Sequence, residues 1–179
     1  MAGTVGRGLQ LEAIKINVKS DADIGVIYTT HVKNDGWHGN SFNGEQSGTT
    51  GQNKHVEALM LKLTGKDADK YDIYYRVHAQ NYGWLAWAKN GEAAGTSGYA
   101  YRLEAIQIVV TAKGDMAPTV FYGGYTSNNA KAYISKTSTV PIINTNASVR
   151  YQSHVSNIGW QSAVENGSLS GTTGRNLGL

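Results

Sequence analysis

The chain of 179 residues has no cysteine and only two prolines. The absence of cysteine excludes disulfide bonds and thiolate metal sites. The net charge of +3 is spread along the sequence without a run of lysine or arginine, which disfavours nucleic-acid binding. No stretch is long and apolar enough to predict a membrane span. Glycine (22) and tyrosine (11), by contrast, are abundant, and both recur at regular positions.

The dominant feature of the sequence is a repeated motif. A full copy reads Tyr-x-x-His, then Asn-x-Gly-Trp, then Gly-Thr-x-Gly, then a glutamate that opens an alternating apolar run; the third copy reaches Leu179 before its glutamate. The copies occupy residues 28–57, 75–104 and 151–174, and residues 3–12 match the tail of a further copy. A unit of about 47 residues is too small to bury its own apolar face, so we expect neighbouring units to pack together.

Alternation of polar and apolar residues predicts strands in every copy. Leu59, Leu61 and Leu63 share one face of the segment that follows Glu57, and the equivalent segments show the same period of two. The Tyr-x-x-His segments also alternate, and they place the histidine on the polar face. We therefore predict an all-β chain with about four short strands in each repeat.

Glycine and glutamate recur at positions that suggest structural roles. Gly36, Gly83 and Gly159 complete Asn-x-Gly turns, in which positive φ angles are tolerated. The glutamates begin the apolar face of their strands, where an unpaired charge would be costly; they are Glu12, Glu57 and Glu104. The simplest partners are backbone N–H groups of the nearby Gly-Thr-x-Gly turn. A ligand-binding or catalytic glutamate is the alternative.

The histidines and aromatic residues are the candidate ligand contacts. Each histidine either bonds to a neighbouring loop or lies beside a ligand groove. No metal or cofactor is expected, because no second metal ligand is close in sequence. Each tryptophan either anchors the packing between units or stacks on a sugar. Strand alternation predicts Trp84 and Trp87 on opposite faces. The predicted ligand-binding residues are His31, Trp37, His78, Tyr82, Trp84, Trp87, His154 and Trp160.

The third copy departs from the pattern. Residues 119–126 resemble the start of a unit, yet Tyr125 stands where histidine is expected, and the motif resumes only at Tyr151. We therefore predict an insertion at residues 123–148, either ordered or acting as a linker. The predicted segments are a closing strand at 1–18, repeat 1 at 19–63, repeat 2 at 64–113 and repeat 3 at 114–179. Because both ends fall inside a repeat, we expect a longer natural protein.

The co-occurrence of Gly-Trp, Gly-Thr-x-Gly and Glu-Ala-Ile in register resembles the clostridial hydrophobic W (ChW) repeat family. The resemblance covers residues 2–113 and 149–179. It implies a non-catalytic repeat of secreted or surface proteins of Gram-positive bacteria, which is thought to bind cell surfaces or polysaccharides.

Three units suggest a closed pseudo-threefold arrangement, similar to a β-trefoil or β-prism, in which the N-terminal strand completes the last repeat. The leading functional hypothesis is a non-enzymatic extracellular module that binds carbohydrate or cell-wall polysaccharide for surface attachment. A protein–protein adhesion or scaffold module, with a partner at the insertion, is the second. A glycan-degrading enzyme is the third, and it lacks a recurring second carboxylate. No nucleic-acid partner is expected.

Overall fold

The computed structural model describes residues 1–118, 127, 129–137 and 142–143, and the backbone of residues 150–151, 154–155, 159–160 and 164–165. The chain divides into two compact units, Met1–Ile143 and Asn144–Leu179. The described residues contain strands and one short 3₁₀ turn, η1 (Ala68–Lys70), so the chain is all-β as predicted. None of these residues belongs to a helix long and apolar enough to cross a membrane.

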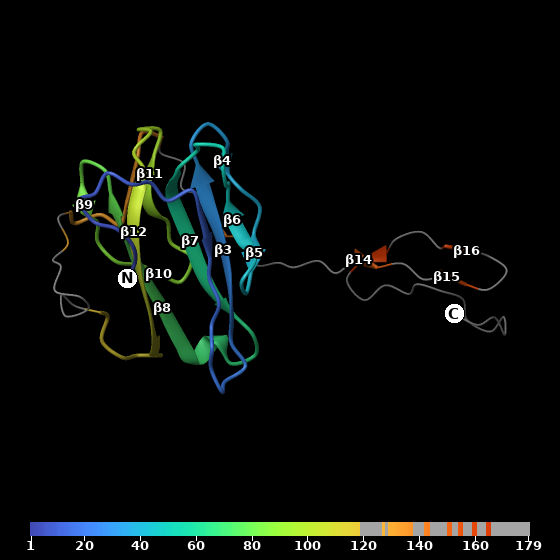
Figure 1. Ribbon diagram of the computed structural model, residues 1–179. Helices are drawn as coiled ribbons and strands as arrows, with labels where there is room; N and C mark the ends of the chain where they lie inside the picture. The colour runs from blue at the N-terminus through green and yellow to red at the C-terminus, as the bar shows by residue number, and fades with distance from the viewer. Residues whose placement is uncertain are drawn as a thin grey trace. The chain divides into compact units, whose positions relative to one another are not determined.

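Two sheets and a short ribbon form the N-terminal unit (Figure 1). One sheet has the order β1-β12-β8-β10, with β9 also paired to β8. The other has the order β13-β11-β7-β3-β4, with β5 also paired to β3, and β2 pairs with β6. The strands are β1 (Ala2–Gly3), β2 (Ala13–Lys15), β3 (Gly25–Val32), β4 (Gly36–Trp37), β5 (Ser41–Phe42), β6 (Gln46–Gly48), β7 (Val56–Thr64), β8 (Tyr71–Ala79), β9 (Gly83–Trp84), β10 (Ala88–Lys89), β11 (Ala94–Ser97), β12 (Leu103–Ala112) and β13 (Tyr133–Ser135).

The two complete repeats have the same internal order. Each begins with a long strand (β3 or β8), turns into the short tryptophan strand (β4 or β9), and ends with a long glutamate strand (β7 or β12) that pairs antiparallel with the first. The Asn-x-Gly turns form as predicted, because Asn34 and Asn81 have φ angles of 67° and 68°. Each repeat supplies five strands instead of the predicted four, since the chain after the tryptophan leaves and rejoins the sheet.

Neighbouring repeats are joined through the Gly-Thr-x-Gly segments. Gly48 pairs with Ala13, Gly95 with Ala58, and Gly3 with Ala105, each time the alanine after a glutamate. Gly95 has a φ of +126°, and a Cβ there would overlap the carbonyl oxygen of Glu57. Glycine is therefore required for the two backbones to approach this closely.

The N-terminal segment pairs with both repeats, through β1 to β12 and through β2 to β6. The sheets do not close into a barrel, and the trefoil or prism arrangement is not confirmed. The sequence also predicts that the N-terminal strand completes the last repeat. The contacts between that strand and the third copy would involve residues outside the described part of the chain.

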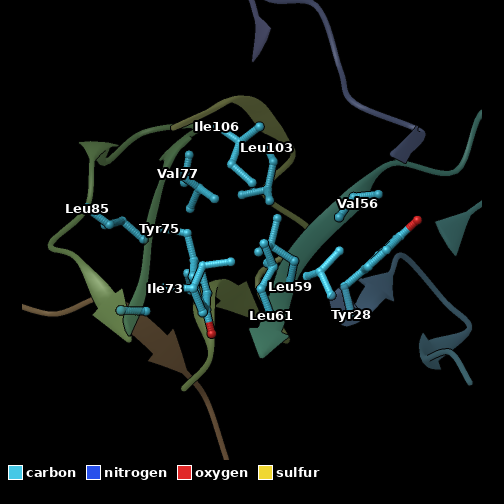
Figure 2. Close-up of a cluster of buried hydrophobic side chains, with 14 of the residues drawn as sticks. Tyr28, Val56, Leu59, Leu61, Ile73, Tyr75, Val77, Leu85, Leu103 and Ile106 are labelled. Atoms are coloured by element: carbon cyan, nitrogen blue, oxygen red, sulfur yellow. The ribbon is translucent and has the colours of Figure 1, made fainter. Parts of the chain in front are cut away.

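The core lies between the long strands of the two repeats (Figure 2). Leu59, Leu61 and Leu63 belong to it, as their alternation predicts. Tyr28 and Tyr75 are fully buried, and their hydroxyls donate hydrogen bonds to the carbonyls of Glu45 and Glu92. The hydroxyl ends lie at the rim of the cluster in Figure 2, so these two rings fill the core while each polar tip has a partner. The labelled side chains are Tyr28, Val56, Leu59, Leu61, Ile73, Tyr75, Val77, Leu85, Leu103 and Ile106.

A register shift occurs at each glutamate of the complete repeats. Val32 pairs with Val56, whereas His31 pairs with Ala58, so Glu57 has no Cα partner. The same shift leaves Glu104 unpaired between Leu103 and Ala105. A β-bulge re-aims the side chain that it carries. The prediction that the glutamate shares the face of the following leucines is therefore wrong, because strict alternation is broken at that residue.

Part of the predicted insertion is ordered strand. Tyr133–Ser135 forms β13 and runs parallel to β11, as its strand-like sequence suggests. Gly95 N–H also donates to the carbonyl of Ala132 at 2.9 Å. The insertion thus extends the sheet of the first repeat.

The C-terminal unit contains two short antiparallel pairs. Its strands are β14 (Arg150–Tyr151), β15 (His154–Val155), β16 (Gly159–Trp160) and β17 (Val164–Glu165). His154 pairs with Trp160 and Val155 with Gly159, which is the register of His31 with Trp37 and of His78 with Trp84. The backbone of the third copy therefore repeats this hairpin.

Candidate functional site

The bulged glutamates lie against histidines from the first strand of the same repeat. His31 Nδ1 is 3.1 Å from Glu57 Oε2, and His78 Nδ1 is 3.1 Å from Glu104 Oε2. The carboxylate side chains are 4% and 5% exposed, so both pairs are largely removed from water. Neither Nδ1 atom forms a hydrogen bond with the described residues, so each contact is an ion pair when the imidazole is protonated.

Each glutamate has a second partner two residues earlier in the chain, and this partner differs among the copies. Gln10 Nε2 donates to Glu12 Oε1 at 2.7 Å, and Arg102 lies 2.8 Å from Glu104. In the first repeat the partner is His55, whose Nε2 is 3.5 Å from Glu57 Oε1. The predicted contact with the Gly-Thr-x-Gly turn is confirmed for Glu12, which accepts a hydrogen bond from Gly51 N–H at 3.2 Å.

Burial controls the ionisation of His55. The residue is 7% exposed, and burial lowers the pKa of His55, while the Glu57 carboxylate offsets part of that effect. The nearby cations Lys33 and Arg102 lower the same pKa further. Glu57 is thus enclosed by two imidazole rings, of which one resists protonation.

A cavity of about 390 Å³ opens beside the His31–Glu57 pair. We call it the His31–Glu57 cavity. Its first wall comes from the first repeat and includes Lys33, and the opposite wall is the Gly-Thr-x-Gly turn of the second repeat. The lining residues are His31, Lys33, Asn34, Gly36, Glu57, Ser97, Gly98, Ala100 and Thr137. The structure thus brings one predicted ligand residue, His31, together with the predicted structural residues Gly36 and Glu57.

The tryptophans of the complete repeats contact these histidines. Trp37 meets His31 edge-on with ring centroids 5.4 Å apart, and Trp84 meets His78 at 5.6 Å. Trp84 is only 2% exposed, so its ring has no face for a sugar, and we assign it to packing. Trp37 is half-buried, beside Ile27, Met60, Ala93 and Ile143.

An arginine brings the two tryptophans of the second repeat together. The guanidinium carbon of Arg76 lies 4.9 Å from the ring centroid of Trp84 and 4.8 Å from that of Trp87. Arg76 is 1% exposed, and its Nε donates to Gln107 Oε1 at 2.7 Å. The prediction that these two rings lie on opposite faces is wrong, because β9 ends at Trp84 and strand alternation stops there.

Sequence reasoning missed several buried polar residues. His55 could have been found by aligning the copies, since it stands two residues before the glutamate, where Gln10 and Arg102 show that each copy has a polar side chain. Asp72 has no such signal. It is 2% exposed and pairs with Lys89 and Lys113, both at 2.9 Å. The hydrogen bond from Lys89 is the largest cause that holds the pKa of the Asp72 carboxyl well below its usual range, while burial opposes this shift.

The remaining predicted residues lie in different surroundings. Tyr82 is half-buried and packs on Tyr101. The side chains of His154 and Trp160 lie outside the described part of the chain. Among the described residues, no group of three or more metal-ligating side chains is close enough to hold an ion.

The fold and these recurring His–Glu–Trp contacts define an all-β protein built from repeats. The family model of clostridial hydrophobic W (ChW) matches residues 1–20, 31–65, 78–112 and 154–179. These segments cover 116 of the 179 residues, and the chain belongs to the ChW family. ChW repeats occur in surface proteins of clostridia. No curated protein and no solved structure matches the chain significantly.

Proposed function

We propose that this chain is a non-catalytic extracellular module that binds carbohydrate, either a cell-wall glycan or an external polysaccharide, for surface attachment. The observation that carries the proposal is the His31–Glu57 cavity. Its lining offers imidazole, carboxylate, hydroxyl and ammonium groups from His31, Glu57 and Lys33 and from two neighbouring segments. Several hydrogen-bonding groups around one concave site suit the hydroxyls of a sugar.

The lining also favours binding over catalysis. Glu57 is the sole carboxylate among the described residues that line the cavity. Glycoside hydrolysis generally uses two carboxylates across the scissile bond. We therefore place the glycan-degrading enzyme last among the three hypotheses.

Repetition supports attachment by several sites. Backbone hydrogen bonds link the three glutamate strands, from Leu11 N–H to Leu103 at 2.9 Å and from Val56 N–H to Leu11 at 2.7 Å. Together with the strand pairings of Gly3, Gly48 and Gly95, these bonds support a pseudo-threefold arrangement, which is part of the same proposal. Weak sites held at fixed positions in one molecule, or in tandem modules, give a strong combined attachment.

A calorimetric titration tests the proposal. The chain is titrated with soluble xylan, a β-1,4-linked N-acetylglucosamine hexamer and purified Gram-positive cell-wall fragments. Thr137→Trp places a large ring in the cavity at an exposed position. We expect saturable binding that this variant weakens by roughly tenfold or more, whereas Thr137→Ser retains it. Absence of binding to every glycan, with the fold intact by circular dichroism, would reject the proposal.

Protein–protein adhesion is the second candidate. It is supported by Met116 and Ile142, which are 88% exposed and lie before and within the insertion. Large exposed apolar side chains are typical of contact surfaces when they gather into a patch. A negative glycan titration, together with a saturable protein contact that Ile142→Asp removes, would favour this candidate.

A further inference from the structure

The second repeat carries a cluster of three tyrosines on its surface. The rings of Tyr99 and Tyr101 stack with centroids 5.6 Å apart and an interplanar angle of 26°. Tyr82 packs on Tyr101 at 5.9 Å with an angle of 58°. All three are half-buried. We call this cluster the tyrosine shelf.

The first repeat has a different structure at the same positions. Asp35, Gln52 and Lys54 align with Tyr82, Tyr99 and Tyr101. Lys54 Nζ forms an ion pair with Asp35 at 2.8 Å. The backbone framework is therefore compatible with a polar pair here, and folding of the repeat does not require aromatic rings. The aromatic rings of the second repeat are therefore better explained by contact with a ligand than by folding.

Polar groups surround the shelf. The exposed Lys136 places its Nζ 4.9 Å from the Tyr99 ring centroid. Arg102, next to Tyr101, is half-buried and is held by Glu104. Aromatic faces with adjacent hydrogen-bond donors match the two sides of a sugar ring, whose C–H face is apolar and whose edge carries hydroxyls.

The shelf and the His31–Glu57 cavity share one loop. Gly98 and Ala100 line the cavity, and Tyr99 and Tyr101 alternate with them along the chain. Thr137 lines the same cavity, and its neighbour Lys136 contacts the shelf. A chain of several sugar units can therefore contact both places.

We propose that Tyr82, Tyr99 and Tyr101 form a stacking subsite for a pyranose unit with equatorial substituents, within a β-linked polysaccharide. Such a ring has axial C–H groups on both faces, which suit an aromatic platform. The subsite deepens the proposed function and rests on it. The three tyrosines supply stacking, while the cavity supplies hydrogen bonds to a neighbouring unit.

Exchange of residues between the repeats tests the subsite. Tyr82→Asp with Tyr101→Lys places the ion pair of the first repeat on the second. The reciprocal variant, Asp35→Tyr with Lys54→Tyr, places aromatic rings on the first repeat. Each is titrated calorimetrically with cellohexaose and chitohexaose, with the fold checked by circular dichroism.

We expect the first exchange to weaken binding of the hexasaccharide by roughly tenfold, and the reciprocal variant to retain or strengthen it. Tyr99→Gln alone is expected to weaken binding by less than the first exchange. Unchanged affinity in the first exchange, with clear binding by the unaltered chain, would overturn the subsite and leave the proposed function intact. Absence of binding by the unaltered chain to these hexasaccharides, while xylan or cell-wall fragments bind, would overturn the subsite alone. Absence of binding to all of these glycans would overturn both. Loss in the shelf variants without loss in Thr137→Trp would retain the shelf and reject the cavity.

Discussion

The first and second repeats share a backbone plan, yet they differ in how they surround its recurring residues. Arg76 contacts both Trp84 and Trp87 in the second repeat, whereas the positions that align with Arg76 and Trp87 in the first repeat are Thr29 and Asn40. A tryptophan at one motif position is therefore almost fully buried in the second repeat and half-buried in the first. A repeated residue therefore keeps its position in the backbone while its exposure changes from copy to copy.

The glutamates show the same contrast in charge. Glu104 is held by His78 and a permanently charged arginine, whereas Glu57 is held by two histidines. The second repeat thus pairs its glutamate with a guanidinium, whereas the first repeat uses His55, whose pKa is lowered by burial. We expect the two repeats to respond differently to packing changes and to acid.

The largest expected effect is at the tryptophans. Trp84→Ala should destabilise the fold by about 3–5 kcal/mol, because a fully packed ring is removed and the Arg76 guanidinium loses one of the two tryptophan rings that it contacts. Trp37→Ala should cost about half as much free energy of unfolding, since Trp37 is only half-buried and its removal exposes less apolar surface. Urea unfolding followed by circular dichroism measures both values. Equal losses would show that the two tryptophans contribute equally to stability despite their different burial.

The glycines that join the repeats come next. Gly95→Ala should cost about 3 kcal/mol, because its positive φ is combined with overlap against Glu57. Gly48→Ala should cost less, since its partner segment at Ala13 is more exposed and can shift.

Gly51→Ala is the matched control for the glycine exchanges. It has a positive φ but no atom within 4 Å of an added Cβ, so about 1 kcal/mol is expected. Thermal unfolding of all three variants gives the order. A loss of stability in Gly51→Ala equal to that in Gly95→Ala would show that the close approach of Gly95 to the Glu57 backbone is not the cause.

The smallest expected effect concerns pH. The pKa of His55 in the folded chain is lowered from its ordinary value of 6.5 by burial, so the unfolded chain takes up the proton first. Stability is then fully present above about pH 6.5 and falls as the pH drops through the folded pKa. His55→Gln, which reproduces the N-terminal copy, should flatten this part of the profile.

Calorimetric melting between about pH 7.5 and pH 5 measures the effect, in the range where histidine titrates. His38→Gln serves as the control, because it removes a more exposed histidine beside Asp35. Equal acid sensitivity in the unaltered chain and in His55→Gln would show that His55 is not the responsible group.

Much of the local structure was predictable from the repeat. The Asn-x-Gly turns and the alternation of Leu59, Leu61 and Leu63 follow from short-range patterns. The partner of Glu57 was not predictable in the same way. A one-residue bulge changes the face of a side chain, and nothing in an alternating pattern marks where the bulge falls.

The repeat, the order of its strands along the chain and the turns between them follow from the amino-acid sequence alone, because turn chemistry and alternation act over a few residues. Three features depend instead on the folded arrangement: which tryptophan is buried, which groups surround each glutamate, and the loop that lines the His31–Glu57 cavity and carries the tyrosine shelf. These features depend on residues far apart in the chain, such as Arg76 with Gln107 and Ser97 with Ser135. The same motif therefore has one backbone and several different surfaces, because burial is set by neighbours that the motif does not contain.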